Sequence, residues 1–308
     1  MLKISVIIPV FNAEKYLDRS LTSVIKALGK VPGEILAVDN GSSDNSLAIL
    51  EDYKKKYPKI IRVLHCKTHG AGAARNHGLS EAKGEYFWFI DADDEIKPSA
   101  ILDLLGVAKK DKDLVMLGEE KIFPSGERIV LSAIDPKEKD FKSRFVRYGM
   151  GPIQFLIRRE WWNKNGFRFR ETGMHEDVEF MSSLILYTDK FASVDKVLYT
   201  YYQNPGSVIY KDKWDKVYLD IFPALAGYYK RFEEMGVLEE YRDEVEWYFI
   251  WNLLIDSTKD FSRFPEGKEG FKKTREMMKE YFPKWRKNQF LKEKPLRLRI
   301  RVRLNYYK

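Results

Sequence analysis

Four acidic side chains crowd into five positions of this chain, directly after a run of bulky residues. The stretch YFWFIDADDEI places Asp91, Asp93, Asp94 and Glu95 at the end of an apolar segment of strand length. Carboxylates in this arrangement can hold Mg²⁺ or Mn²⁺, which prefer hard oxygen ligands and usually share them with the phosphates of a substrate. Acid pairs at strand ends also cap the helix that follows. Taken alone, the motif leaves a metal site and a helix cap as alternatives.

Strands and helical patterns alternate through the first 120 residues. The apolar runs of strand length are KISVIIPV, EILAVD, IIRVLHC and EYFWFI, and helical patterns separate them. This alternation predicts an α/β fold with a mostly parallel sheet and helices on both faces. Ligands bind beyond the carboxyl ends of the strands in such sheets. Because PVFNAE, DNGSSD, THGAGAARN and DADDE all follow strands, we expect them to form one composite site.

Length and composition limit the class of protein. The chain has 308 residues, which suffices for one large α/β domain plus an extension. Its single cysteine, Cys66, excludes an internal disulfide framework and a cysteine-based zinc cluster. No apolar run reaches the roughly 18 residues of a membrane span, and the N-terminus lacks a signal-peptide layout. We therefore expect a cytoplasmic protein.

The residue pattern changes along the chain, and we expect three parts. The first is a catalytic domain at residues 1–210, with a nucleotide-binding part at about 1–120 and an acceptor part at about 121–210. A helical, aromatic-rich region follows at 211–283, and it forms a C-terminal helical extension of the α/β domain. The third part is a basic tail at 284–308.

The basic tail contains ten basic residues and one acid. Its segment PLRLRIRVRL alternates strictly between apolar residues and arginine, which predicts a strand with one apolar and one cationic face. The segment could pack on the body of the protein or attach peripherally to an anionic membrane surface, at the inner face of the cell membrane. Nucleic acid is a third and unfavoured partner, because no recognition module precedes the tail.

Five segments taken together resemble the family 2 glycosyltransferases, which have the GT-A fold. They are SVIIPVFNAEKYLDRSLTSV, EILAVDNGSSDNS, GAGAARNHGL, YFWFIDADDEI and GMHEDVEF. Their order and spacing also match the family, over roughly residues 3–207. The resemblance implies a GT-A, Rossmann-like catalytic domain. It also implies a hexosyltransferase that uses a nucleotide-sugar donor with Mn²⁺ or Mg²⁺ as cofactor.

The resemblance implies roles for residues at matching positions. Asp93 would ligate the metal ion, and Asp177 would be the general base, with Glu176 beside it in the catalytic set. The implied nucleotide-binding residues are Pro9, Val10, Phe11, Glu14, Asp39, Arg75, Asn76, Asp91 and Ala92. Weaker candidates for contact with the acceptor or the diphosphate are His175, Trp161 and Ser207.

Some of these residues have alternative roles. Asp177 lies at the start of an expected helix over residues 176–187, where the helix dipole favours the ionised form that a base needs. Glu176 and Asp177 could instead only complement that dipole. Trp161 could stack on a sugar, although an aromatic residue at a strand–helix junction is more often part of the core.

Two residues depart from the family pattern. Asn40 stands second in DNGS, where the family usually has a pair of aspartates, and Gln203 stands where an arginine near the diphosphate is common. The second departure removes one phosphate-binding cation. Both departures bear on which nucleotide the site would hold.

The resemblance implies an inverting glycosyltransferase. It would move a sugar from a nucleotide diphosphate sugar, with UDP-sugar as the favoured donor, to a hydroxyl of a glycan or lipid-linked acceptor. A nucleotidyltransferase-like enzyme is an alternative, but it would need a glycine-rich, lysine-bearing phosphate loop that PVFNAEKY lacks. A non-catalytic nucleotide-sugar or glycan-binding protein of the same fold should lack Asp93 or Asp177, and both are present.

Overall fold

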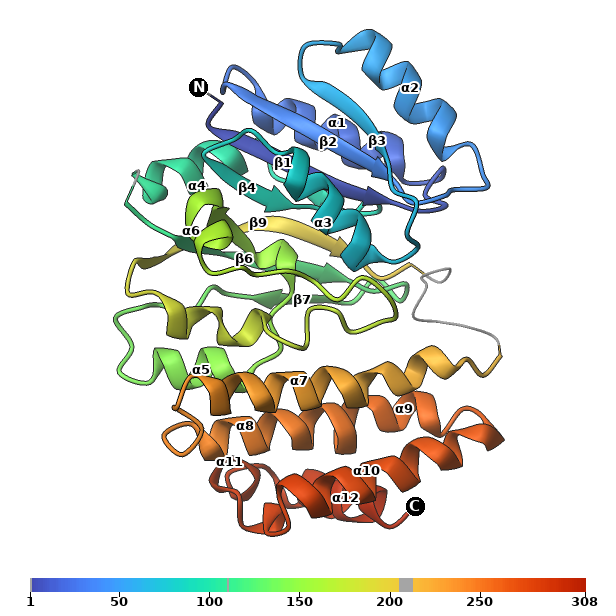
Figure 1. The fold of residues 1–308 in the computed structure, drawn as a ribbon, viewed down its shortest axis with the longest axis vertical. Helices are drawn as coiled ribbons and strands as arrows, with labels where there is room; N and C mark the ends of the chain where they lie inside the picture. The colour runs from blue at the N-terminus through green and yellow to red at the C-terminus, as the bar shows by residue number, and fades with distance from the viewer. Residues whose placement is uncertain (1, 110, 205–212) are drawn as a thin grey trace. The chain divides into compact units, whose positions relative to one another are not determined.

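The computed structural model describes residues 2–109, 111–204 and 213–308, and its contacts divide the chain into two compact units (Figure 1). Unit 1 comprises Met1–Lys139, Gly151–Thr172 and Thr188–Ser207. Unit 2 comprises Asp140–Met150, Gly173–Tyr187 and Val208–Lys308. Two segments that precede residue 188 in the sequence therefore belong to the same unit as the C-terminal helices.

Unit 1 is built on one sheet in the order β3-β2-β1-β4-β8-β6-β9-β5, with β7 paired to β6. The strands are β1 (Ile4–Val10), β2 (Gly33–Asp39), β3 (Ile61–His65), β4 (Tyr86–Phe89), β5 (Glu95–Ile96), β6 (Leu114–Ile122), β7 (Arg128–Leu131), β8 (Phe155–Arg158) and β9 (Phe191–Tyr202). The first four strands are parallel, so their carboxyl ends share one edge. Antiparallel pairs join β8 to β4 and β6. The predicted α/β fold is confirmed.

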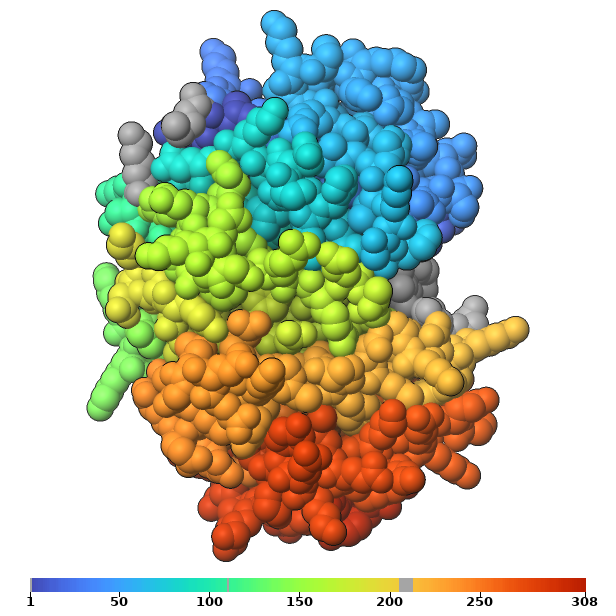
Figure 2. All heavy atoms as spheres, viewed as in Figure 1, coloured from blue at the N-terminus to red at the C-terminus, as the bar shows by residue number. Residues whose placement is uncertain are grey.

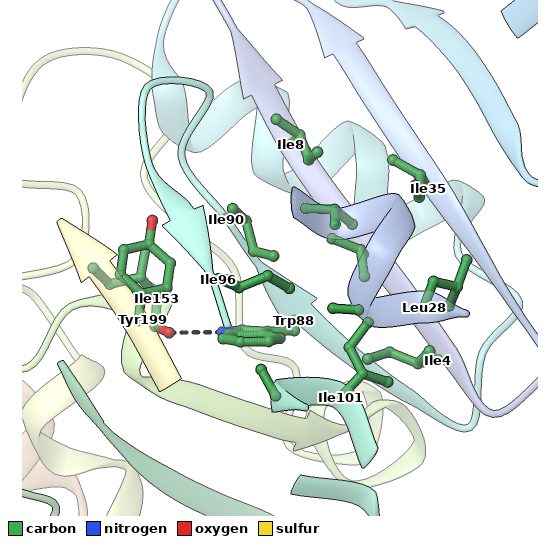
Figure 3. Packing of buried hydrophobic residues seen from close by; sticks show 14 of the residues in the cluster. Ile4, Ile8, Leu28, Ile35, Trp88, Ile90, Ile96, Ile101, Ile153 and Tyr199 are labelled. Carbon is green, nitrogen blue, oxygen red and sulfur yellow. Dashed lines mark hydrogen bonds between the residues drawn. The ribbon is translucent and has the colours of Figure 1, made fainter. Parts of the chain in front are cut away.

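Helices cover both faces of this sheet. They are α1 (Leu17–Leu28), α2 (Ser46–Lys56), α3 (Ala71–Glu81), α4 (Ala100–Ala108) and α6 (Arg159–Lys164), and a 3₁₀ turn η1 covers Pro152–Gln154. On one face, α1 and α4 pack on the side chains of β1, β2 and β4 that Figure 3 shows. On the other face α3 lies close to β1, because a Cβ at Gly78 would come within 2.5 Å of Ile7.

Trp88 lies at the centre of the hydrophobic core of unit 1. Its indole Nε1 donates a hydrogen bond of 2.7 Å to the carbonyl oxygen of Ile153 in η1 (Figure 3). The ring also lies 6.3 Å from the ring of Tyr199 on β9, measured between centroids. One aromatic residue of β4 is therefore packed against two segments that follow it by more than sixty residues.

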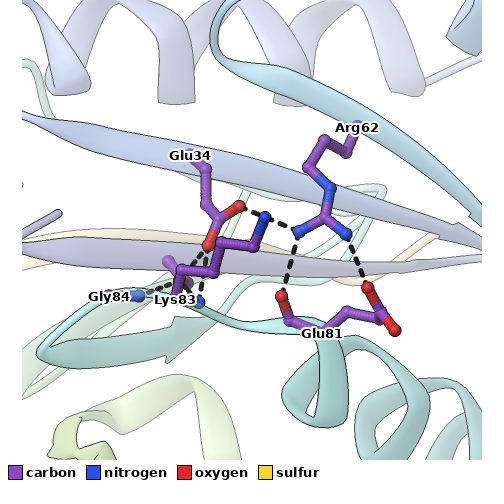
Figure 4. Close-up of polar contacts among 6 residues, drawn as sticks. Glu34, Arg62, Glu81, Lys83 and Gly84 are labelled. Carbon is purple, nitrogen blue, oxygen red and sulfur yellow. Dashed lines mark hydrogen bonds and ion pairs between the residues drawn. The ribbon is translucent and has the colours of Figure 1, made fainter.

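A buried polar network joins the amino-terminal ends of the strands (Figure 4). The carboxylate of Glu34 accepts hydrogen bonds from the Ser5 hydroxyl at 2.8 Å and from the Lys83 backbone at 2.7 Å. Arg62 donates to the other oxygen of Glu34 at 3.1 Å and to Glu81 at 2.6 Å. Because Glu34 is buried, these donors are what stabilise its charge.

Unit 2 is helical. Its elements are α5 (Phe141–Arg147), η2 (Met181–Tyr187), η3 (Lys216–Asp220), α7 (Ile221–Glu234), α8 (Arg242–Phe249), the π-helix η4 (Ile250–Asp256), α9 (Ser257–Phe261), η5 (Pro265–Gly267), α10 (Lys268–Tyr281), η6 (Trp285–Lys287), α11 (Gln289–Lys292) and α12 (Leu296–Tyr306). In Figure 2 the atoms of the helices from α7 to α12 are the orange and red spheres. The expected C-terminal helical extension is confirmed. Among the described residues, no helix is both long and apolar enough to cross a membrane.

The structure corrects the prediction of a strand in the basic tail. Residues 296–306 form the helix α12, although their sequence alternates with period two. Tertiary contacts decide this, because Val302 is fully buried and the amide of Asn305 donates 2.9 Å to the carbonyl of Leu254 in η4. Both anchors lie on one face of a helix and would lie on opposite faces of a strand.

Glu34→Ala should lower the free energy of unfolding by about 2–4 kcal/mol, since it leaves the buried donors of this network without an acceptor. Glu51→Ala is the matched control: it removes an exposed ion pair with Lys54 and should change stability by about 0.5 kcal/mol or less. Denaturant unfolding measures both. Equal effects of the two substitutions would contradict a structural role for the network.

Candidate active site

Side-chain hydrogen bonds tie the loop after β1 to the loop after β2. The carboxylate of Glu14 accepts from the backbone and side-chain nitrogens of Asn45, at 3.0 and 2.9 Å. Asn12 has a left-handed backbone (φ 49°), and its side-chain oxygen accepts from the backbone of Ser43 at 2.8 Å. These bonds fix the two loops against each other at the carboxyl edge of the sheet. Glu14, a predicted nucleotide ligand, has this structural role in the free protein.

Asn40 ties the loop after β2 to the loop after β3. Its side-chain nitrogen donates to the Thr68 carbonyl at 2.7 Å, and its side-chain oxygen accepts from the Gly70 backbone at 2.8 Å. An aspartate could accept the second bond but could not donate the first. Asp39, a predicted nucleotide-binding residue, is buried beside it and accepts from the backbones of Gly41 and Ser42 at 3.3 and 3.2 Å.

Arg75 brings a buried positive charge from α3 to the acids that follow β4. Its guanidinium donates to Asp91 at 3.0 Å, and the Arg75 side chain is 7% exposed. The neighbouring Asn76 forms a pair of hydrogen bonds with the backbone of Phe169, at 2.9 and 3.0 Å. The structure thus brings Arg75 and Asp91 together, whereas the amide of Asn76 holds the segment after α6.

Asp93 lies between an amide and an arginine. One carboxylate oxygen accepts from the side chain of Asn204 at 2.9 Å, and the backbone carbonyl of Asp93 accepts from Arg19. The guanidinium of Arg19 stacks 3.7 Å from the ring centre of Tyr202. Burial, followed by the charge of Asp91, raises the pKa of Asp93 above its ordinary value. The ionised form of Asp93 is therefore under electrostatic strain.

The next residue, Asp94, is completely buried. Its carboxylate accepts from the Tyr199 hydroxyl at 2.6 Å and from the backbone of Tyr202 at 2.8 Å. The same Tyr199 oxygen accepts from the backbone nitrogen of Asp91 at 3.1 Å. Burial and the charges of Asp91 and Asp93 raise the pKa of Asp94 well above its usual range. These bonds make Asp94 and Tyr199 the support of the loop that carries Asp91 and Asp93.

Four other predicted nucleotide-binding residues at this edge differ in how their atoms could contact a ligand. Val10 and Ala92 belong to the hydrophobic core, so they could contact a ligand only through their backbone. Phe11 directly follows Val10, just after the end of β1, and 49% of its surface is exposed. Pro9, within β1, is only partly buried. The ring of Phe11 is therefore the apolar surface that the β1 loop offers to a ligand.

The segment with Glu176 and Asp177 belongs to unit 2 and is held by Asp220. The carboxylate of Asp220 accepts from the backbone of Met174 at 3.0 Å, and a Cβ at Gly173 would lie 2.2 Å from it. His175 has a left-handed backbone (φ 62°), which a non-glycine residue adopts only at a cost of about 1–3 kcal/mol. Such strain next to an acid pair is common at functional sites.

The expected helix at residues 176–187 is corrected in part. The chain forms a turn in which the carbonyl of Asp177 accepts from the backbones of Phe180 and Met181, and the 3₁₀ helix η2 begins at Met181. Asp177 therefore has no α-helix dipole behind it. Its surroundings include Tyr248 of α8, whose pKa is raised first by burial and then by the charge of Asp177.

Two of the weaker candidates have different outcomes. Trp161 is 7% exposed and packs on Phe167 with ring centres 5.2 Å apart, which favours the alternative role in the core, and the sugar contact stays a prediction. Ser207 lies outside the described residues. Sequence reasoning missed Arg19, Tyr199, Asn204 and Asp220, because their roles depend on partners distant in the sequence.

The residues after β4 fit a divalent cation that is shared with a ligand. Within the described residues, no group of three His, Cys, Asp or Glu side chains could hold a metal ion by itself. Asp93 offers one carboxylate oxygen beyond the one that Asn204 occupies, and burial, followed by the charge of Asp91, raises its pKa. Mg²⁺ and Mn²⁺ are commonly held by one or two carboxylates together with phosphate oxygens.

The fold and the loops at its carboxyl edge define a GT-A protein. The structure of Staphylococcus aureus TarS residues 1–349 in complex with UDP-GlcNAc aligns with this chain at a TM-score of 0.74. The alignment covers 99% of this chain and 88% of that one at 20% sequence identity. The similarity at this identity establishes the fold.

Residues 5–168 match the profile of Glycosyl transferase family 2, and the chain belongs to this family. It is 31% identical over 223 residues to a cholesterol galactosyltransferase of Borreliella burgdorferi, which covers 67% of this chain and 62% of that protein. It is 38% identical over 122 residues to a poly(ribitol-phosphate) beta-glucosyltransferase of Bacillus spizizenii, which covers 39% of this chain and 19% of that protein. The chain thus spans less than two thirds of the length of these relatives.

Tyr199→Phe should loosen the loop after β4, because it removes both hydrogen bonds that the phenol makes with this loop. We expect the backbone amides of residues 91–95 to exchange hydrogen at least about tenfold faster in the folded protein. Hydrogen-exchange mass spectrometry measures this rate.

Tyr228→Phe is the matched control, since Tyr228 is also fully buried and donates one bond, to the carbonyl of Val146 in unit 2. Both variants should lose about 1–3 kcal/mol of stability. Only Tyr199→Phe should change exchange at residues 91–95. Unchanged exchange there in Tyr199→Phe would show that the phenol does not support the loop.

Proposed function

We propose that the protein is an inverting glycosyltransferase that uses a nucleotide diphosphate sugar. The observation that carries this proposal is the pair Asp91–Asp93 at the carboxyl edge of β4, with Arg75 bound to Asp91 and an oxygen of Asp93 left for a ligand. Family membership supports the reaction class. The loops after β1, β2 and β3 are bound to one another at the same edge, which favours a preorganised site.

In the proposed reaction, the acceptor hydroxyl attacks the anomeric carbon of the donor sugar. The bond from this carbon to the diphosphate oxygen breaks, and its electron pair leaves with the diphosphate. The proton of the acceptor hydroxyl passes to the carboxylate of Asp177. The assignment of Asp177 rests on its HED motif, and the hydrogen bond from Met174 to Asp220 supports it by holding the loop that carries the motif.

Residues of unit 1 would bind the donor. Asp39, Arg75, Asp91 and the loop of Phe11 and Glu14 would hold the nucleoside and ribose. Asp93 would bind Mn²⁺ or Mg²⁺, which when bound neutralises the charge that develops on the leaving diphosphate. The raised pKa of Asp93 supports this role, because a cation there would relieve the repulsion between Asp93 and Asp91.

A UDP-sugar is the favoured donor, and a hydroxyl of a glycan or lipid-linked sugar is the favoured acceptor. The UDP-GlcNAc bound by TarS supports the choice of nucleotide. The named acceptors of the relatives, cholesterol and poly(ribitol-phosphate), differ in chemistry and do not single out one class. Calorimetry with UDP, GDP and CDP, each with and without Mn²⁺, tests the donor assignment directly.

Asp177→Asn should lower kcat by ~10²–10⁴, because the amide cannot accept the proton of the acceptor hydroxyl. The affinity for UDP should remain within about threefold of wild type, since the donor-binding residues proposed above are unchanged. Asp195→Asn, an equivalent change at an exposed position of β9, is the control for loss of one charge. Full activity of Asp177→Asn would disprove the base assignment.

Asp93→Asn should weaken Mn²⁺-dependent UDP binding by at least about tenfold while leaving the free energy of unfolding equal or higher. The sign follows from the raised pKa: the ionised carboxylate is disfavoured in the folded state, so removing its charge at neutral pH does not cost stability. Calorimetry and thermal unfolding measure the two effects. A variant that binds UDP with Mn²⁺ like wild type would exclude Asp93 as metal ligand.

A further inference from the structure

Helix α12 presents an apolar stripe to solvent. Leu296, Ile300 and Leu304 are 65%, 48% and 62% exposed, and their spacing of four residues places them on one face. Tyr307 extends the stripe at the end of the helix. Of the eleven large apolar side chains that are exposed in the described part of the chain, these four form one group. The opposite face of α12 is anchored by Val302 and Asn305, so the stripe is a fixed surface feature.

Arginines border the stripe on both sides. At 3.6 residues per turn, Arg297 and Arg301 lie along one side and Arg303 along the other, and all three are exposed. In the described structure none of the three forms an ion pair with an acid. No aspartate or glutamate occurs after Glu293. The exposed face of α12 is therefore apolar along its centre, cationic at its borders and free of negative charge.

The exposed face of α10 in the same unit is different. Its residues Lys272 and Lys273 pair with Glu276 and Glu269 at 3.9 and 3.4 Å. Its exposed positions carry lysine and glutamate in nearly equal number and no large apolar side chain. Such a face of mixed charge is typical of a solvent-exposed helix. The combination of an apolar stripe with bordering arginines is therefore found on α12 and not on α10.

We propose that α12 binds the surface of an anionic lipid bilayer. Leucine and isoleucine along the stripe would enter the boundary between head groups and acyl chains, and the bordering arginines would reach the phosphates. Tyr307 suits the same depth, since its ring is apolar and its hydroxyl, which accepts from Arg286 at 2.8 Å, is polar. The arginines could also bind the phosphates of a nucleic acid, but the central line of aliphatic side chains would have no apolar partner there.

The binding is interfacial, with the helix axis along the membrane plane. α12 has 11 residues, which at 1.5 Å per residue is far too short to span a bilayer. The arginines provide long-range attraction that salt screens, and the apolar stripe provides contact that salt does not weaken. This two-part dependence separates the proposal from attraction by net charge alone. It is independent of the sugar-transfer reaction, and either can fail without the other.

The test is flotation of the whole protein with vesicles of phosphatidylglycerol and phosphatidylcholine in equal parts, and with phosphatidylcholine alone. Wild type should float with the anionic vesicles. The variant Leu296→Ser/Ile300→Ser/Leu304→Ser, which keeps every charge, should float less than a tenth as well. Arg297→Gln/Arg301→Gln/Arg303→Gln should lose binding to a similar degree. Both variants keep the buried anchors of α12, and UDP binding measured on the same samples verifies that the rest of the protein is intact.

The control is Lys268→Gln/Lys272→Gln/Lys279→Gln on α10, which removes the same charge from an exposed helix face and should float like wild type. Three flotation results would overturn the proposal. In the first, wild type floats with neither kind of vesicle. In the second, the triple-serine variant floats like wild type. In the third, the α10 control floats as weakly as the arginine variant. A wild type that light scattering shows to be dimeric without lipid, with a monomeric serine variant, would assign the stripe to self-association instead.

Discussion

Repulsion among the carboxylates after β4 is the constraint on which the arrangement of unit 1 depends. Three aspartates within four positions raise the free energy of the fold unless each has its own partner. Arg75 supplies a charge to Asp91, Asn204 an amide to Asp93, and Tyr199 a hydroxyl to Asp94. The last two partners lie 111 and 105 residues away in the sequence. The acids can therefore occupy the sheet edge only when β9 is in place.

These partners do not fully compensate the negative charges of the aspartates, and this links the stability of the site to its proposed function. The pKa values of Asp93 and Asp94 remain raised by burial and by their neighbours. A fully compensated cluster would be more stable but would have less affinity for the cation that we propose to bind there. Natural sites commonly sacrifice some stability for such preorganised charge. The hydrogen bonds between the loops after β1, β2 and β3 supply rigidity at the same edge.

The departure from the family pattern at Asn40 has a physical reason in the structure. Asn40 replaces the second acid of the usual pair, and it serves as donor and acceptor between two loops, which aspartate cannot do. In unit 2, Asp220 fixes the strained turn that precedes the proposed base. The same unit carries α12, so the proposed membrane surface and the proposed base belong to one compact body.

The sequence by itself determined the strands, their alternation with helices and the edge at which the polar loops gather, because periodicity and turn chemistry are local properties. It also predicts that Asp91 and Arg75 gather at one edge, where the structure brings them into contact. Only the tertiary structure decided that Trp161 packs on Phe167, that the amide of Asn76 bonds the backbone of Phe169 and that Asp93 meets Asn204. It also decided that residues 296–306 form a helix, since Val302 and Asn305 are anchored on one side. These outcomes depend on partners far along the chain, and no local pattern of residues encodes which distant side chain will lie opposite.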